Sequence, residues 1–167
     1  ATKSGVDFLI VDLELRGLPG NYMVYLVSRP YNVDHMIEVR SAGVEGDGWF
    51  ITINDELALT TDMDPVQFGS YDVNRDASED ASFGRLNGML RINDELGWAH
   101  AALGYTAVIR NGGVWRLRIK APIDPLRNTP HNRALTKSIN DSDIQVALKD
   151  WDSINNMVFS FVVQNDA

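Results

Sequence analysis

Residues 7–16, DFLIVDLELR, decide the fold class of this chain. The stretch begins as an apolar run and then alternates strictly between apolar and charged side chains. One face holds Val11, Leu13 and Leu15, and the other holds Asp12, Glu14 and Arg16. Because successive side chains of a β-strand point to opposite faces, this period of two predicts a strand with one buried face.

The segment that follows predicts a turn and a second strand. Residues 17–21, GLPGN, favour a turn, because glycine takes a positive φ at little cost and proline fixes its own φ. Residues 22–27, YMVYLV, then resume as a run typical of a strand. We expect these two strands to pair as a hairpin.

Short segments of the same kind recur along the chain, separated by Gly, Asn, Asp and Pro. The further expected strands are residues 35–40, 49–53, 86–92, 105–110, 114–120 and 157–163. Such a series is typical of an antiparallel two-sheet sandwich, of which the jelly roll is one arrangement. We therefore expect an all-β fold in which residues 1–167 form a single β-sandwich domain. Its first and last strands should lie inside the sheets, because the last is too apolar for an exposed edge.

Two segments depart from this pattern. Residues 98–103, WAHAAL, are rich in alanine and predict a helical turn. Residues 141–151, DSDIQVALKDW, begin with Asp and place Ile144, Leu148 and Trp151 at helical spacing. They predict one short helix.

Charge and composition restrict the classes of partner. The chain of 167 residues has a formal net charge of −8 and no cysteine. An acidic surface disfavours nucleic acid, whose binding depends on lysine and arginine, and the absence of cysteine excludes disulfides and thiolate metal sites. The apolar runs are far shorter than the ~20 residues of a membrane helix, so no membrane insertion is expected. The compartment stays open, with an extracellular or virion-surface location favoured.

The pentapeptide INDEL occurs twice, at residues 53–57 and 92–96. Each copy follows an apolar stretch, and Leu57 or Leu96 begins another after three polar residues. The preferred interpretation is a strand, a three-residue turn and a strand, because Asn and Asp side chains bond nearby backbone groups and tolerate a left-handed φ. The alternative is a cation site, in which the carboxylates of Asp55 and Asp94, with Glu56 and Glu95, would meet.

Calcium is the one cofactor for which the sequence offers a further candidate. Residues 71–80, YDVNRDASED, carry oxygen-bearing side chains at alternate positions: Asp72, Asn74, Asp76, Ser78 and Asp80. This spacing matches the front half of an EF-hand loop. Ala77 stands where that loop has glycine, and Phe83 where it has its closing glutamate. An acidic surface loop without metal is therefore the preferred interpretation.

A basic stripe occurs in residues 114–120, VWRLRIK. Alternation places Arg116, Arg118 and Lys120 on one face, with Trp115 on the other and interior. The preferred interpretation is a ladder of ion pairs opposite Asp12 and Glu14. The alternative is a seat for a carboxylate-bearing ligand, to which arginine can donate two parallel hydrogen bonds.

Two tryptophans complete the candidate ligand site. Trp49 and Trp98 each adjoin a glycine near a copy of INDEL, and we expect them to be exposed. If the two copies neighbour each other, Trp49, Trp98, Asp55 and Asp94 would share one end of the domain.

Three classes of function follow. The first is a non-catalytic recognition domain, lectin-like or adhesin-like, that binds a glycan or a protein surface through these loops. The second is a structural, self-assembling subunit, such as a viral capsid or fibre-head protein; for either class we expect a homo-oligomer. The third is an enzyme on a β scaffold, which is least favoured because the three histidines are scattered and no nucleophile, phosphate-loop or zinc motif occurs.

Overall fold

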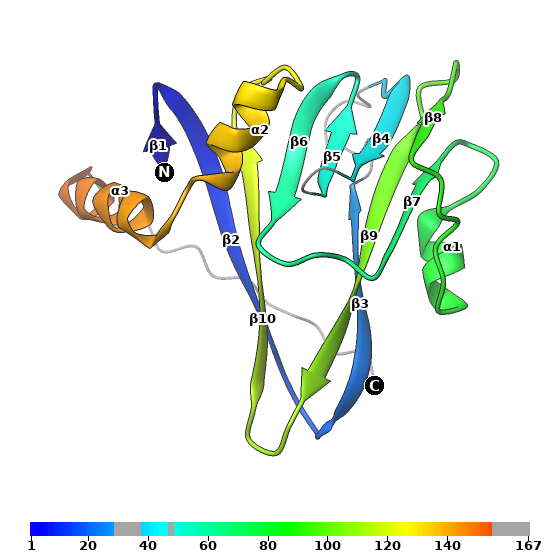
Figure 1. Cartoon of the computed structure of the whole chain (residues 1–167), viewed down its shortest axis with the longest axis horizontal. Coiled ribbons are helices and arrows are strands. Elements are labelled where there is room, and N and C mark those ends of the chain that lie inside the picture. The colour runs from blue at the N-terminus through cyan, green and yellow to red at the C-terminus, as the bar shows by residue number, and fades with distance from the viewer. Residues whose placement is uncertain (29–37, 47–48, 155–167) are drawn as a thin grey trace.

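The protein is an antiparallel β-sandwich, seen in a computed structural model that describes residues 1–28, 38–46 and 49–154 (Figure 1). The larger sheet contains, in order, β1 (Thr2–Lys3), β2 (Val6–Arg16), β10 (Val114–Pro122), β6 (Glu56–Thr61), β5 (Phe50–Ile53), β4 (Ser41–Glu45) and β8 (Arg91–Asn93). The smaller sheet contains β3 (Gly20–Ser28), β9 (His100–Ile109) and β7 (Gln67–Tyr71). The all-β sandwich expected from the alternating segments is confirmed.

The core lies between the two sheets. Its buried side chains come from both sheets and include Val44, Ile51, Leu103, Tyr105, Trp115 and Leu117. Trp115 is interior, as the alternation in residues 114–120 predicts. Each such side chain contributes roughly 1.5–3 kcal/mol through its removal from water, so this layer is the main source of stability.

The expected hairpin between residues 7–15 and 22–27 is wrong. Both segments form strands, but β2 pairs with β10 and β3 pairs with β9, so the turn after Arg16 carries the chain from one sheet to the other. The segment between β9 and β10 does the same at the same end of the molecule (Figure 1). A turn composition predicts a reversal of the chain but does not say whether the strands lie side by side or face each other. The pairing of these four strands is nested, since β2 with β10 encloses β3 with β9 along the chain.

Two local predictions are corrected. Residues 98–103 do not form a helical turn, since β9 begins at His100. Ala101, Ala102 and Leu103 are all fully buried, because both faces of this strand are covered. Such a strand lacks the alternation of apolar and polar residues, and its alanine-rich sequence was therefore interpreted as helical. Residues 86–92 are a strand only from Arg91, where β8 begins.

Three helices lie among the described residues. The expected one is α3 (Asp141–Ile154), which begins after Asn140, whose Oδ1 accepts hydrogen bonds from the backbone N–H groups of Ser142 and Asp143 at 2.9 and 3.3 Å. The sequence pattern did not predict α1 (Ala77–Ser82) or α2 (Pro130–Lys137). None of the helices in the described part of the chain is long and apolar enough to cross a membrane.

Two expected strands cannot be compared in full with the structure. Residues 157–163 lie outside the described residues, as do residues 35–37 of the segment 35–40. In the remainder of that segment, Val39 forms a parallel bridge with Trp98.

Candidate functional site

The two copies of INDEL meet on opposite sides of β4. Ala42 in β4 has two register partners, Ile53 of the first copy and Ile92 of the second. Since β5 and β8 both run antiparallel to β4, they point in the same direction and end at the same end of the sandwich (Figure 1). The expectation that Asp55 and Asp94 share one end of the domain is therefore met by the geometry of these strands.

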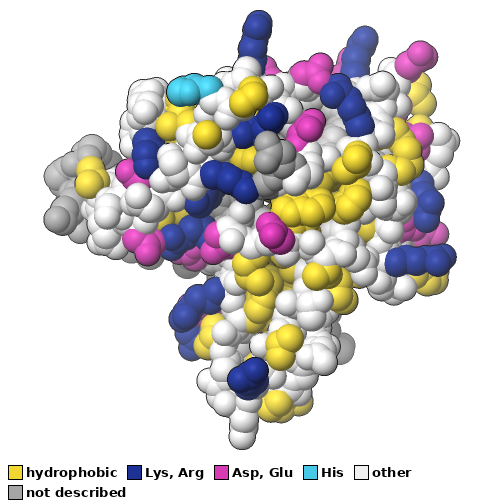
Figure 2. Space-filling view, in the orientation of Figure 1, with side chains coloured by type: hydrophobic (Ala, Val, Ile, Leu, Met, Phe, Trp, Pro, Cys, Tyr) yellow, Lys and Arg dark blue, Asp and Glu magenta, His cyan; other side chains and the backbone are white. Residues whose placement is uncertain are grey.

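An open polar pocket of about 490 Å³ lies where the two copies meet. We call it the INDEL pocket; it is lined by Arg40, Ser41, Asp55, Arg91, Asn93, Asp94 and Glu95. Figure 2 shows basic and acidic side chains together at this upper end of the molecule. Ligand sites are usually concave and mostly apolar with a few placed polar groups. The INDEL pocket shares the concave form and the converging polar groups, but its lining is polar throughout.

The first copy is a two-residue hairpin turn. Ile53 pairs with Glu56, which leaves Asn54 and Asp55 at the tip with φ values of 50° and 65°. Two positive φ values are the mark of a type I′ turn, and Asn and Asp tolerate them better than most residues do. The turn thus has two residues, and the expected third, Glu56, already belongs to β6.

The Asn54 side chain fixes this turn to the strand beside it. Its Oδ1 accepts hydrogen bonds from the backbone N–H of Arg40 at 2.8 Å and of Ser41 at 3.2 Å. Its Nδ2 donates to the carbonyl oxygen of Glu38 at 3.0 Å. The wall of the INDEL pocket at Arg40 and Ser41 is therefore held in place by a side chain of the turn.

The second copy has the same sequence but a different structure. Asp94 is buried, and its two carboxylate oxygens accept hydrogen bonds from the N–H of Leu96 and the N–H of Val73, both at 2.8 Å. The chain turns at residues 94–97, and the N–H of Gly97 donates to the carbonyl oxygen of Asp94 at 3.2 Å. The second copy therefore follows the end of β8 and does not form a hairpin with it. The buried Asp94 side chain holds this turn through its two hydrogen bonds.

The accessible charges in the INDEL pocket are of both signs: Arg40, Arg91, Asp55 and Glu95 are exposed, and Asp94 is buried. Arg91 forms an ion pair with Asp55 across the pocket, and Arg40 pairs with Glu38 at 2.9 Å. The side chains of Arg40 and Arg91 are 71% and 51% exposed, so both guanidinium groups can exchange these partners for a ligand. The sequence pattern identified neither arginine as a site residue, although the two INDEL copies mark the strands whose ends bring Arg40 and Arg91 together.

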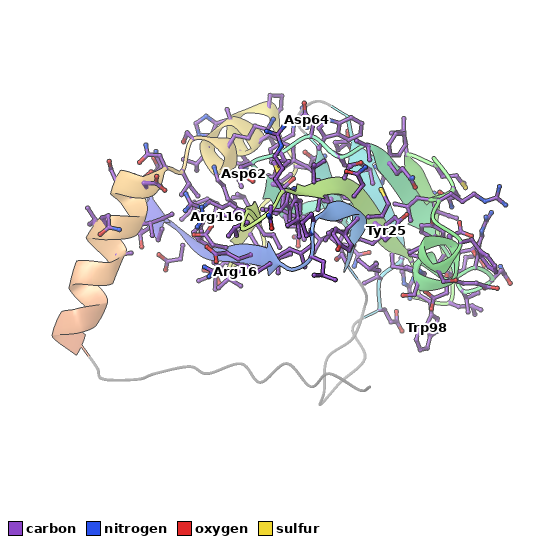
Figure 3. All side chains as sticks on the ribbon, turned by 90° about the horizontal axis from the view of Figure 1, so that it is seen from below. Arg16, Tyr25, Asp62, Asp64, Trp98 and Arg116 are labelled. Atoms are coloured by element: carbon purple, nitrogen blue, oxygen red, sulfur yellow. The ribbon has the colours of Figure 1, made fainter. Side chains whose placement is uncertain are left out.

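The two tryptophans do not lie together. Trp98 is 40% exposed and projects from the body of the protein (Figure 3). Its backbone forms a bridge with Val39, the residue before Arg40, but Trp98 is not among the residues that line the INDEL pocket. Trp49 is half-buried, and its ring centroid lies 5.4 Å from that of Phe68. Trp49 precedes β5, whereas the pocket lies after it, so Trp49 belongs to the core rather than to the site.

The basic stripe of β10 is largely a ladder of ion pairs. Arg116 and Arg118 stand opposite Glu14 and Asp12 in register. The Nε of Arg116 lies 2.7 Å from Glu14 Oε1, and Glu14 also binds Arg16 at 2.8 Å on the same face (Figure 3). These ion pairs form the cross-strand ladder that the alternating charges predict. Arg116 already binds the carboxylate of Glu14, so this group is engaged within the protein.

Lys120 departs from this ladder. It is buried beneath α2, and its ammonium group donates to the carbonyl oxygens of Lys137 at 3.0 Å and Ile139 at 2.7 Å. Burial lowers the pKa of Lys120. It therefore anchors the end of α2 to the sheet.

The candidate calcium residues are engaged in local structure. Asp72 Oδ1 accepts from the N–H of Asn74 at 2.9 Å, and Asp76 Oδ1 accepts from the N–H of Ser78 at 2.7 Å, which makes Asp76 the N-cap of α1. Asp80 is buried and pairs with Arg75 at 2.8 Å. Within the part of the chain that the structure describes, no three His, Asp or Glu side chains are arranged to hold a metal ion.

His100 has a structural environment. Its Nε2 accepts a hydrogen bond from the N–H of Ala77 at 3.2 Å, and its Nδ1 lies 3.0 Å from the carbonyl oxygen of Trp98. The ring stacks on Tyr71 with centroids 5.4 Å apart. Both ring nitrogens thus contact backbone atoms, and the side chain holds the start of α1 against β9.

Comparison with protein-family models, with curated proteins and with solved structures gives no significant match.

Proposed function

We propose that this protein is a non-catalytic recognition domain that binds a carbohydrate at the INDEL pocket. The observation that supports this proposal is the convergence of two turns, far apart in the sequence, on one open polar pocket, with the exposed Trp98 directly after the second turn. Carbohydrate sites need hydrogen-bonding groups for the hydroxyls of the sugar and an aromatic face for its C–H groups. The INDEL pocket and Trp98 supply both.

The two exposed arginines of the pocket favour a sugar with a negative charge. Arg40 and Arg91 are the flexible cations of the pocket, and a guanidinium binds a carboxylate through two parallel hydrogen bonds. Glu95 and Asn93 add acceptors for hydroxyl groups. We therefore expect uronic or sialic acid-type sugars to bind more tightly than their neutral counterparts.

A glycan array followed by tryptophan fluorescence titration tests this function. The expected result is saturable binding of acidic glycans with a change in fluorescence that Trp98→Phe reduces. Arg91→Ala should weaken binding by about tenfold or more, because it removes a charge-assisted contact. The matched control is Arg110→Ala, a change at an exposed arginine outside the pocket. An array without any response would refute the proposal.

A further inference from the structure

The dipeptide Asn-Gly occurs twice in the sequence, at residues 87–88 and 111–112. Such a pair can rearrange without an enzyme, because glycine has no side chain to keep its backbone nitrogen away from the preceding asparagine. The structure places the two copies in different surroundings. Their comparison indicates which of the two can react in the folded protein.

The rearrangement is an attack of the glycine backbone nitrogen on Cγ of the preceding asparagine. A bond forms between this nitrogen and Cγ, the bond between Cγ and Nδ2 breaks, and the side-chain nitrogen leaves as ammonia with the proton of the glycine N–H. Water then opens the five-membered succinimide ring at one of its two carbonyl carbons. The product is aspartate, or isoaspartate, in which the main chain continues through the former side chain.

This chemistry sets two structural requirements. The asparagine side chain must rotate until its Cγ lies about 3–3.5 Å from the glycine nitrogen. The glycine N–H must also be free, because a hydrogen bond would hold both the nitrogen and the proton that has to leave. An Asn-Gly pair that is fixed at either group is therefore protected.

Asn111 and Gly112 meet both requirements. They are exposed in the turn between β9 and β10, at the lower end of the molecule in Figure 1. Among the residues that the structure describes, neither the Asn111 side chain nor the Gly112 N–H has a hydrogen-bond partner. Gly112 has a φ of 70°, and a Cβ at this position would meet no atom within 4 Å. The turn is closed by the N–H of Gly113, which donates to the carbonyl oxygen of Arg110 at 2.7 Å and leaves both reacting groups free.

Asn87 and Gly88 are held by hydrogen bonds at each reacting group. Asn87 Nδ2 donates to the carbonyl oxygen of Ser70 at 2.7 Å, and its Oδ1 accepts from the N–H of Met89 at 2.9 Å. The N–H of Gly88 donates to the carbonyl oxygen of Phe68 at 2.9 Å. These bonds would have to break before Gly88 could attack Asn87. The same dipeptide is therefore protected where it lies beside β7.

We infer that Asn111 is a site of spontaneous deamidation and isoaspartate formation, and that the fold protects Asn87 from the same reaction. Each event at Asn111 adds one negative charge to a chain whose formal net charge is already −8. Isoaspartate also adds one carbon to the main chain between Arg110 and Gly113, in the turn that joins the two sheets. This inference is independent of ligand binding at the INDEL pocket.

Peptide mapping of the full chain after incubation in mildly alkaline buffer gives the first test. The peptide that contains Asn111 should gain the mass expected for replacement of NH₂ by OH. This gain should be at least about tenfold faster than in the peptide that contains Asn87, whose hydrogen bonds must first break. Electron-transfer fragmentation then distinguishes isoaspartate from aspartate at residue 111.

A pair of variants assigns the acidic product that ion-exchange chromatography should detect. Asn111→Gln should remove this product, because glutamine would have to form a six-membered ring. The matched control is Asn21→Gln, at an exposed asparagine that precedes tyrosine, and it should leave the rate of formation unchanged. An acidic product that persists in Asn111→Gln would place the reaction elsewhere and overturn the inference.

Unfolding separates the effect of the structure from that of the local sequence. In urea the hydrogen bonds of Asn87 are absent, so the two dipeptides should react at similar rates. Equal rates in the folded protein, a faster reaction at Asn87, or no reaction at Asn111 in the folded chain would overturn the inference. A difference between the two sites that persists in urea would equally refute protection by the fold.

Discussion

Arg118 on β10 and Asp12 on β2 face each other across the paired strands, with Arg118 Nε and Nη2 at 2.6 and 2.8 Å from the two carboxylate oxygens of Asp12. Arg118 Nη1 also binds Asp141 at the start of α3. One guanidinium group thus joins the two longest paired strands of the larger sheet to the helix beside them.

Replacement of Asp12 by Asn should lower the free energy of unfolding by about 0.5 kcal/mol at neutral pH, a value discounted for the exposure of this pair. The hydrogen bonds from Arg118 hold the pKa of Asp12 below its ordinary value of 3.8. The contribution is therefore complete above about pH 4 and is lost as the pH falls through the pKa of the folded state. Urea unfolding between pH 2 and pH 7 should show the two proteins converging in acid. Asp124→Asn, at an exposed position, should give no such convergence.

The buried carboxylate of the second INDEL copy should matter more than its exposed neighbour. Asp94→Ala leaves the N–H groups of Val73 and Leu96 without their acceptor and should cost about 2 kcal/mol of stability. Glu95→Ala, in the same turn but exposed, should change the free energy of unfolding by less than about 0.5 kcal/mol. Equal losses in thermal unfolding would show that Asp94 does not anchor the turn.

The first INDEL turn permits a test of two adjacent positions with the same backbone requirement. Asp55→Gly should stabilise the protein by about 0.5–1 kcal/mol, because glycine adopts the positive φ without strain. Asn54→Gly relieves the same strain but removes the hydrogen bonds to Arg40, Ser41 and Glu38, and should destabilise the protein by about 1–2 kcal/mol. Denaturant midpoints that move in the same direction for both variants would contradict this assignment.

Lys120 should make stability rise with pH in the alkaline range. Because burial lowers its pKa, the unfolded chain binds this proton more tightly than the folded protein does. Stability therefore increases as the pH rises from the folded-state pKa towards the ordinary value of about 10.5. Lys120→Met should flatten this rise in urea unfolding between pH 7 and pH 9.5, below the titration of the tyrosines. Lys137→Met, at an exposed lysine, should retain most of the slope of the wild type, because burial of Lys120 is the larger cause and the charge of Lys137 a smaller one.

Calcium should leave the stability of the protein unchanged. The oxygens of Asp76 and Asp80 already accept hydrogen bonds from Ser78 and Arg75, so a cation would have to replace these contacts. The melting temperature measured with chelator and with millimolar Ca²⁺ should agree. A rise in melting temperature with calcium concentration, abolished by Asp72→Asn, would show that residues 72–80 form a site.

The sequence predicts strands well where one face is buried and the other is charged. β2 and β10 have this arrangement, and the register that joins Asp12 to Arg118 follows from their alternating charges. β9 lies at the centre of the smaller sheet with Ala101, Ala102 and Leu103 buried on both faces, so its period was hidden. The missed helix α2 carried a local signal, since Thr129 caps its first turn and Pro130 follows.

The candidate site was predictable in part for a similar reason. The repeated INDEL sequence indicated that Asp55 and Asp94 end strands in a similar way, and the geometry of β4 places them at one end. Arg40 and Arg91 both line the pocket because β4 pairs with β8. This pairing is a contact between distant parts of the sequence, which the local sequence pattern does not predict. The two copies differ in their contacts: Asp94 accepts a hydrogen bond from the N–H of Val73, whereas Asp55 forms an ion pair with Arg91.

The nested pairing of the four long strands also shapes how the chain must fold. Leu13 pairs with Leu117 and Val24 pairs with Tyr105, so each pair joins residues far apart in the sequence. Domains with such non-local pairings fold in roughly milliseconds to seconds. At a synthesis rate of roughly 5–20 residues per second, several seconds separate the emergence of β3 from that of β9. During this interval the apolar faces of β2 and β3 have no partners. Aggregation is therefore a greater hazard for the nascent chain on the ribosome than for the finished sandwich.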